Sequence, residues 1–183
     1  VRSGDYKDCE DAAIVVIAIG EARKPGQTRL DMLGRSVEML KELLEQLSPY
    51  KISGIVVTIT NPADIVADYV RKGLGLERNK VFGTGTLLDT ARLIRTLSEE
   101  SGVSRHSIQA FSLGEHGDSS MIPFSTVTIG GLPFDEYDIS KEKVLEATRQ
   151  IGMTIIEGKK STEFGIGRAL TEMAACILRD EKK

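Results

Sequence analysis

Blocks of apolar and polar residues along the chain predict an alternating series of strands and helices. Residues 12–19 (AAIVVIAI) form a continuous apolar run before Gly20, which is typical of a strand covered on both faces in a parallel sheet. Apolar residues then recur at helical spacing over residues 30–48 and predict an amphipathic helix. A β-branched run over 55–60 (IVVTIT) predicts a second strand, and Asn61-Pro62 marks the start of another helix.

The second half of the chain changes this alternation. We expect a strand over 80–82, a helix over 87–100, and then a pair of strands over 108–113 and 121–129. Two more helices follow, the first capped by Ser140 and the second starting near residue 164. The first is expected to bury a stripe made of Val144, Ala147, Ile151 and Ile155. This order predicts an α/β fold that passes into α+β.

Composition narrows the class of protein. The chain has 183 residues, of which 40% are hydrophobic and 28% charged, as in an ordinary soluble globular protein. Its net charge of −3 gives no electrostatic support for nucleic-acid binding. No apolar run approaches the roughly 18 residues of a membrane span, and no segment resembles a signal peptide. The two cysteines lack metal or redox spacing, so reduced thiols in a cytoplasm are expected, without a membrane partner.

The first candidate for chemistry is His116, one of two histidines in the chain. It lies in residues 114–118 (GEHGD), directly after an apolar run. A single imidazole at a strand end suits proton transfer near neutral pH. The alternative is a loop histidine without a role.

Three further features place polar groups near strand or helix ends. Residues 21–29 (EARKPGQTR) form a polar segment with three basic residues, either a lid that closes on an anion or a solvated linker. Asn61 follows a strand and precedes a helix, where ligands bind in open α/β sheets. Asp89 and Arg92 are three residues apart on one helix face, either as part of a site or as a surface ion pair.

Four motifs in chain order resemble those of the lactate/malate dehydrogenase family. They are residues 24–29 (KPGQTR), Asn61-Pro62, 89–92 (DTAR) and 114–118 (GEHGD). The resemblance covers essentially the whole chain, and residues 83–92 and 113–117 look most like the lactate and L-2-hydroxyisocaproate dehydrogenase branch. It implies an incomplete Rossmann-type NAD-binding domain over residues 1–82 and an incomplete α+β catalytic domain over 83–183.

The resemblance implies roles for five polar residues. His116 is expected to exchange a proton with the substrate hydroxyl, and Asp89 to hold the imidazole and favour its protonated form. Arg92 is expected to grip the substrate carboxylate through two parallel hydrogen bonds. Arg29 is expected to polarise the substrate carbonyl, and Asn61 to donate a hydrogen bond to the substrate oxygen.

The same resemblance implies NAD as the cofactor and no metal. The residues expected to touch NAD are Gly20, Glu21, Ile59, Thr60, Asn61 and Thr84. Tyr6 matches a position near the adenine side, although a packed loop aromatic is the alternative. The family also implies a homo-oligomer, either a dimer or a tetramer, acting on a small 2-hydroxy or 2-keto acid in carbohydrate metabolism.

Three residues bear on the substrate and give opposing indications. Arg23 resembles the residue with which malate dehydrogenases meet a second carboxylate. Thr162 and Glu115 resemble residues of lactate-type enzymes. We therefore expect L-lactate and pyruvate as the main pair, with malate or L-2-hydroxyisocaproate as alternatives.

The family's glycine-rich turn and the acidic residue that selects NAD over NADP are missing from this sequence. The chain therefore looks like a fragment, and NAD is inferred from the family alone. One rival hypothesis is a fragment that folds or assembles without turnover. Another is a metal hydrolase built on Glu115, His116 and Asp118, which is disfavoured because His106 lies in an unsuitable turn.

Overall fold

The computed structural model describes residues 1–20, 29–117, 119–159 and 162–182, without the side chains of residues 29–33 and 35. The chain divides into two compact units, Val1–Thr84 with Leu170–Lys183, and Gly85–Ala169. The limit between the units falls inside helix α5 (Glu163–Leu178). The division at residues 82 and 83 drawn from the sequence stays a prediction.

The first unit is built on a parallel sheet of three strands, β1 (Ile14–Ile17), β2 (Ile55–Thr58) and β3 (Val81–Gly83). The strands lie in the order β1-β2-β3, and both pairs are parallel. Thr58 is in register with the last residue of each neighbouring strand. The carboxyl ends of the three strands therefore meet at one edge of the sheet, and the parallel sheet expected from residues 12–19 is confirmed.

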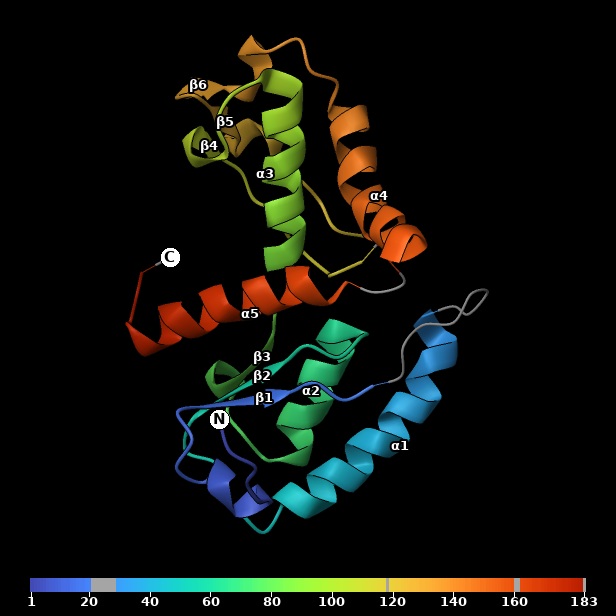
Figure 1. Cartoon of the computed structure of the whole chain (residues 1–183), viewed down its shortest axis with the longest axis vertical. Helices are drawn as coiled ribbons and strands as arrows, with labels where there is room; N and C mark the ends of the chain where they lie inside the picture. Colours follow the sequence, from blue (N-terminus) through green and yellow to red (C-terminus); the bar gives the residue numbers. More distant parts are fainter. Residues whose placement is uncertain (21–28, 118, 160–161, 183) are drawn as a thin grey trace. The chain divides into compact units, whose positions relative to one another are not determined.

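Two long helices connect these strands, α1 (Arg29–Leu47) and α2 (Ala63–Gly73), and both lie beside the sheet in Figure 1. Short 3₁₀ turns precede β1 at Tyr6–Cys9 and β3 at Arg78–Lys80. The core between helices and sheet contains fully buried aliphatic residues, among them Leu40, Leu47, Val56, Val66 and Val70. Burial of these side chains, each worth about 1.5–3 kcal/mol, holds the edge of the sheet in place.

The second unit is organised around α3 (Leu87–Ser101), which packs beside α4 (Lys141–Lys159) (Figure 1). The helix α3 ends one residue beyond its expected limit, because Gly102 takes the left-handed conformation, with φ 70°, that terminates helices. Its buried face carries Leu93 and Leu97, both fully buried in the core of this unit.

A small antiparallel sheet completes the second unit, with β4 (Ile108–Gln109), β5 (Thr128–Ile129) and β6 (Leu132–Pro133). The prediction of continuous strands over 108–113 and 121–129 is wrong. An isolated bridge pairs Leu113 with Met121. The 3₁₀ turn Phe124–Thr126 lies between β4 and β5, while Arg105–Ser107 precedes β4 and Phe134–Glu136 follows β6. Pro123 has no N–H to donate to a ladder, so pairing stops there.

The helix α4 differs from its predicted stripe at one position. Val144 is buried as expected, but Ala147 is exposed and Thr148 takes the buried place. The Thr148 hydroxyl donates to the Val144 carbonyl at 2.7 Å, which satisfies the buried polar group. Ser140 caps the helix as predicted, since its Oγ accepts from the Lys143 N–H at 3.3 Å.

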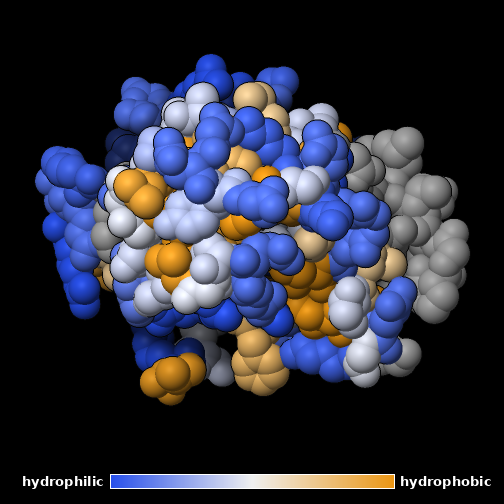
Figure 2. Space-filling model, turned by 90° about the horizontal axis from the view of Figure 1, so that it is seen from above, coloured by the Kyte–Doolittle hydropathy of each residue, from blue (hydrophilic) through white to orange (hydrophobic). Residues whose placement is uncertain are grey.

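The surface is a mixture of hydrophilic and apolar residues. Figure 2 shows hydrophilic residues around smaller apolar groups on the face seen from above. Among the described residues, none of the helices combines the length and the hydropathy needed to cross a bilayer.

Candidate active site

The centre of the candidate site is a chain of three charged side chains in the second unit. Nδ1 of His116 lies 2.6 Å from Oδ2 of Asp89, and Oδ1 of the same carboxylate accepts a hydrogen bond from Nη1 of Arg92 at 3.2 Å. Asp89 therefore uses one oxygen for the imidazole and the other for the guanidinium. The three residues that the motifs single out are brought together.

Two different segments position these groups. Asp89 and Arg92 lie on the first turns of α3, and their spacing of three places them on one face of the helix. His116 lies in the loop that the bridge between Leu113 and Met121 closes. The bridge fixes both ends of that loop, which brings the imidazole to the helix.

The three side chains of this chain of contacts are largely shielded from solvent. The side chains of Asp89 and Arg92 are 15% and 14% exposed, and that of His116 is 21% exposed. Burial of the Asp89 carboxyl raises its pKa, but the hydrogen bond and charge of His116, together with the Arg92 guanidinium, outweigh this effect. The pKa of Asp89 is thereby held below its usual range, so the group carries its negative charge at neutral pH.

The Arg92 guanidinium is also confined by α4. A Cβ atom added at Gly152 would lie 3.2 Å from Nη2 and 3.4 Å from both Cζ and Nη1 of Arg92. The missing side chain at this position is what leaves room for the guanidinium. Gly152 could not be identified from the sequence, because a glycine inside a helix has several explanations.

The first unit gathers most of the other expected site residues at the carboxyl ends of its strands. Gly20 follows β1, Ile59 and Thr60 follow β2, and Thr84 follows β3. The Ile59 N–H donates to the Ile17 carbonyl at 3.0 Å, and the Thr84 N–H donates to the Thr58 carbonyl at 3.2 Å. The Thr60 hydroxyl donates to the Ile19 carbonyl. These bonds hold the turns after the strands, where open α/β sheets bind ligands.

Asn61 lies directly after this group and is exposed. The peptide bond between Asn61 and Pro62 is cis, and Pro62 is the N-cap of α2. The side chain of Asn61 therefore lies at the amino end of a helix and beyond the end of a strand, as the sequence predicts.

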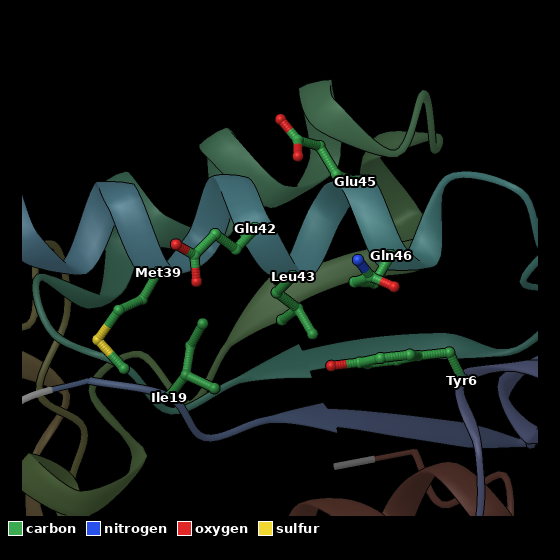
Figure 3. Close-up of a pocket in the computed structure, with 7 residues that line it drawn as sticks. All are labelled: Tyr6, Ile19, Met39, Glu42, Leu43, Glu45 and Gln46. Atoms are coloured by element: carbon green, nitrogen blue, oxygen red, sulfur yellow. The ribbon is translucent and has the colours of Figure 1, made fainter.

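A hollow of ≈ 460 Å³ opens between α1 and the start of the first unit. Five of its lining residues come from α1, and Tyr6 and Ile19 come from the segments on either side of β1. Figure 3 shows the Tyr6 ring extending toward Ile19 below Leu43. Tyr6 is 45% exposed, so its ring forms a wall of the hollow and is not part of the core.

Several expected site residues lie outside this picture. Glu21, Arg23 and Asp118 lie outside the described residues, as does the side chain of Arg29. Thr162 is half-buried just before α5. In the described parts of the chain, no three His, Cys, Asp or Glu side chains gather as a metal site requires.

Both parts of the chain match models of one protein family. Residues 1–83 match the NAD binding domain of lactate/malate dehydrogenase, and residues 86–183 match the alpha/beta C-terminal domain. The chain belongs to the lactate/malate dehydrogenase family. The resemblance inferred from the four motifs is therefore confirmed, as are the α/β fold class and the parallel sheet.

Similar proteins of this family carry lactate or malate dehydrogenase names. L-lactate dehydrogenase of Fervidobacterium nodosum is 37% identical over 195 residues, which covers 100% of this chain and 63% of the relative. L-lactate dehydrogenase 3 of Bacillus cereus is 41% identical over 190 residues, covering 99% of this chain and 60% of the relative. The chain thus spans about three fifths of the length of these dehydrogenases.

Solved structures of the family superpose closely on the chain. A lactate dehydrogenase from a Medee basin deep-sea metagenome library gives a TM-score of 0.88 at 37% identity, over 98% of this chain and 60% of that one. Malate dehydrogenase from Aeropyrum pernix gives 0.91 at 32% identity, over 99% of this chain and 60% of that one. Since lactate and malate dehydrogenases fit about equally well, the fold does not choose between the two substrates.

Proposed function

We propose that the full-length protein is an NAD-dependent L-2-hydroxyacid dehydrogenase that interconverts L-lactate and pyruvate. The observation that carries this proposal is the chain of contacts from His116 through Asp89 to Arg92. It joins an acid–base group, the carboxylate that orients it and a cation that can bind a carboxylic acid. A 2-hydroxy acid offers a matching hydroxyl and carboxylate on adjacent carbons.

In this proposal His116 handles the proton of the reaction. In lactate oxidation the hydroxyl proton passes to the imidazole as the C–H bond breaks and the carbonyl forms. NAD, when bound, would supply the acceptor for the hydride that leaves the same carbon. Asp89 holds Nδ1 at 2.6 Å, and its negative charge stabilises the imidazolium that results. In pyruvate reduction His116 returns the proton to the oxygen.

Arg92 is proposed to hold the substrate by its carboxylate. The guanidinium is 14% exposed and bonds Asp89 through Nη1, so its plane is fixed before substrate arrives. A planar guanidinium can donate two parallel hydrogen bonds to a carboxylate. Arg29 is proposed to polarise the substrate carbonyl, and Asn61 to donate to the substrate oxygen, both on the strength of the motifs.

The residues of the first unit fit the cofactor. Gly20, Ile59, Thr60 and Thr84 surround the carboxyl ends of three parallel strands, and Glu21 and Asn61 adjoin them in sequence. The hollow beside Tyr6 is apolar at Ile19 and Leu43, which suits the flat face of an adenine ring. We propose that these residues would hold NAD, with Tyr6 on its adenine side.

Lactate is favoured as the substrate over two alternatives. Thr162 and Glu115 match lactate-type motifs, and the L-lactate dehydrogenases above are similar over the whole chain. Arg23 favours malate, because a cation at that position would attract a second carboxylate by about 4 kcal/mol at 4 Å and an effective dielectric of 20. L-2-hydroxyisocaproate stays open, since the motifs resemble that branch as well.

Assembly and compartment follow from the family resemblance. We propose a homo-oligomer, either a dimer or a tetramer, that works in the cytoplasm on small acids of carbohydrate metabolism. Sedimentation of the full-length protein would test the assembly. An alternative is that the 183 residues by themselves fold or assemble without turnover, since they span about three fifths of the relatives.

The deciding experiment is steady-state kinetics of the full-length protein with NADH and each of pyruvate, oxaloacetate and 2-ketoisocaproate. We expect the highest kcat/KM for pyruvate and a loss of at least about a hundredfold in H116Q. Arg23→Gln should lower oxaloacetate activity more than pyruvate activity. Preference for oxaloacetate would replace lactate with malate, and no NADH oxidation with any of the three would refute the proposal.

A further inference from the structure

The backbone of Ser112 is held from two sides by threonine hydroxyls of α3. The Thr86 hydroxyl donates to the Ser112 carbonyl at 2.6 Å, and the Ser112 N–H donates to Oγ1 of Thr90 at 3.0 Å. Ser112 is buried, with 4% of its surface exposed. Both hydrogen-bonding groups of a buried peptide segment are therefore satisfied by one helix. We refer to Thr86 and Thr90 as the hydroxyl clamp.

The hydroxyl clamp bonds the backbone groups that a neighbouring strand would bond in a sheet. The N–H and C=O of Leu113 both pair with Met121, at 2.9 Å each. In extended chain the polar groups of successive residues point to opposite sides. The groups of Ser112 therefore point away from Met121 and toward α3, where the two hydroxyls receive them. The segment before His116 is thus bonded along both of its edges.

The clamp brackets Asp89 on the helix. Thr86 is the N-cap of α3, and the Thr90 N–H donates to the Thr86 carbonyl at 2.8 Å. Their spacing of four places both hydroxyls on one face. Asp89 leaves the same turn of helix and reaches His116, four residues beyond Ser112. One turn of α3 therefore holds the histidine segment by its backbone and by its imidazole.

We propose that Thr86 and Thr90 are positioning residues that set the distance between His116 and Asp89. The proposal rests on the proposed function of that pair. A charge-assisted contact at 2.6 Å depends steeply on the separation of its atoms. The loop that carries His116 is tied by the bridge at Leu113 and Met121, but that bridge makes no bond to α3. The clamp supplies the connection between the loop and the helix.

The test compares T86V and T90V with T148V in the full-length protein. Valine keeps the shape of threonine and removes the hydroxyl. Thr148 is the control for loss of a hydroxyl, because its hydroxyl bonds the Val144 carbonyl of its own helix. Thr148 is buried, whereas Thr86 and Thr90 are half-buried, so it is the stricter test of folding. We expect kcat for pyruvate to fall about tenfold in T86V and T90V, with KM within about twofold, and to stay unchanged in T148V. T86S and T90S keep the hydroxyl and should restore kcat.

Two spectroscopic measurements test the clamp without turnover. In the native protein the amide proton of Ser112 should exchange slowly, and the proton shared by His116 and Asp89 should give a resolved downfield NMR signal. In T90V the Ser112 amide should exchange faster and the downfield signal should broaden. Neither signal needs substrate. A protein that does not reduce pyruvate would therefore refute the proposed function, and these two signals would still decide whether the clamp exists.

Three results would overturn the clamp. One is a Ser112 amide in the native protein that exchanges as fast as an exposed amide. Another is an unchanged downfield signal in both valine variants. The last is a pair of valine variants that lose thermal stability but keep the native kcat, because the two hydroxyls would then act on stability alone. If T90V does not fold, the result for T86V decides whether the proposal holds, because T86V removes a donor at the end of the helix and leaves its interior unchanged.

Discussion

Nδ1 of His116 lies 2.6 Å from Oδ2 of Asp89, although the two residues are 27 positions apart in the chain. The contact assigns one ring nitrogen to the carboxylate, so in the proposed reaction the other, Nε2, would exchange protons with substrate. It also ties the acid–base group to α3, the helix that carries Arg92. In the proposed reaction, one stretch of α3 would therefore position both the acid–base group and the group that binds substrate.

Replacing Asp89 with Asn should impair turnover far more than it impairs folding. Asparagine keeps the shape of the side chain but has no charge with which to stabilise a protonated imidazole. We expect kcat for pyruvate reduction to fall at least about a hundredfold. Steady-state kinetics of the full-length D89N protein would measure this.

Glu99→Gln is the matched control for this substitution. Glu99 also lies on α3 and pairs with Arg95 at 2.8 Å, but its side chain is 55% exposed. Such exposed pairs are worth at most about 1 kcal/mol, so E99Q should keep its kcat. If kcat fell by similar factors in D89N and E99Q, the loss would come from removing any negative charge on α3, and Asp89 would have no specific role.

Asp89 should also give the protein a pH-dependent stability with a defined sign. Its pKa is lowered in the folded protein, chiefly because His116 and Arg92 outweigh the effect of burial. Below the unfolded pKa of about 3.9 the unfolded chain binds the proton first, so the stability from Asp89 declines as the pH falls through the folded pKa. At neutral pH the full contribution is present.

Urea unfolding of the native protein and of D89N at several pH values would measure this contribution. At pH 7 we expect D89N to be less stable by about 1–3 kcal/mol, the usual cost of losing a hydrogen bond to a charged group. As the pH falls below about 4, the difference between the two proteins should shrink. A difference that grows toward low pH would contradict the assigned sign.

Apolar spacing and helix-ending residues predicted the limits of the helices well, but they predicted the limits of the short strands poorly. The helix over 87–100 is confirmed to within a residue, because its apolar spacing and Gly102 both signal its limits. The strand expected over 121–129 is wrong at Pro123, which is the N-cap of a 3₁₀ turn. Apolar runs of this length do not distinguish a strand from extended chain that packs without a ladder. The exposure of Ala147 shows the same limit, since Thr148 could enter the core only because its hydroxyl found the Val144 carbonyl.

The site divides in a similar way. The spacing of Asp89 and Arg92 predicts their shared face, and the contact between them bears this out. No local pattern connects His116 to Asp89, so that contact could be expected only from the family resemblance. Thr86, Thr90 and Gly152 were not foreseen, because their roles depend on what packs against α3. Two threonines four residues apart around Asp89 were the only signal of the clamp.

Replacing Arg92 with Lys should weaken substrate binding more than it slows the chemical step. Lysine keeps the positive charge but cannot donate two parallel hydrogen bonds to one carboxylate. It would also lose the fixed contact with Asp89, which is 3.2 Å in the native protein. We expect KM for pyruvate to rise about 10- to 100-fold, as for the loss of one charge-assisted hydrogen bond. A KM within twofold of the native value would remove Arg92 from substrate binding.

Replacing Gly152 with Ala should change stability and substrate binding in opposite directions. Gly152 lies inside α4, where alanine is favoured over glycine by about 0.5–1 kcal/mol. Its new Cβ would lie 3.2 Å from Nη2 of Arg92, so the guanidinium must move by a few tenths of an ångström. A displaced guanidinium cannot keep both hydrogen bonds to a carboxylate. We expect a higher melting temperature together with a KM for pyruvate raised about five- to tenfold.

Gly158→Ala separates these two effects. Gly158 lies on the same helix, and a Cβ there would have no neighbour within 4 Å. G158A should therefore stabilise the helix or leave it unchanged, without altering KM. Thermal melts and pyruvate kinetics of both variants would give four values for comparison. If KM rises equally in G152A and G158A, the change is a property of helix α4 as a whole, and the room beside Arg92 has no part in substrate binding.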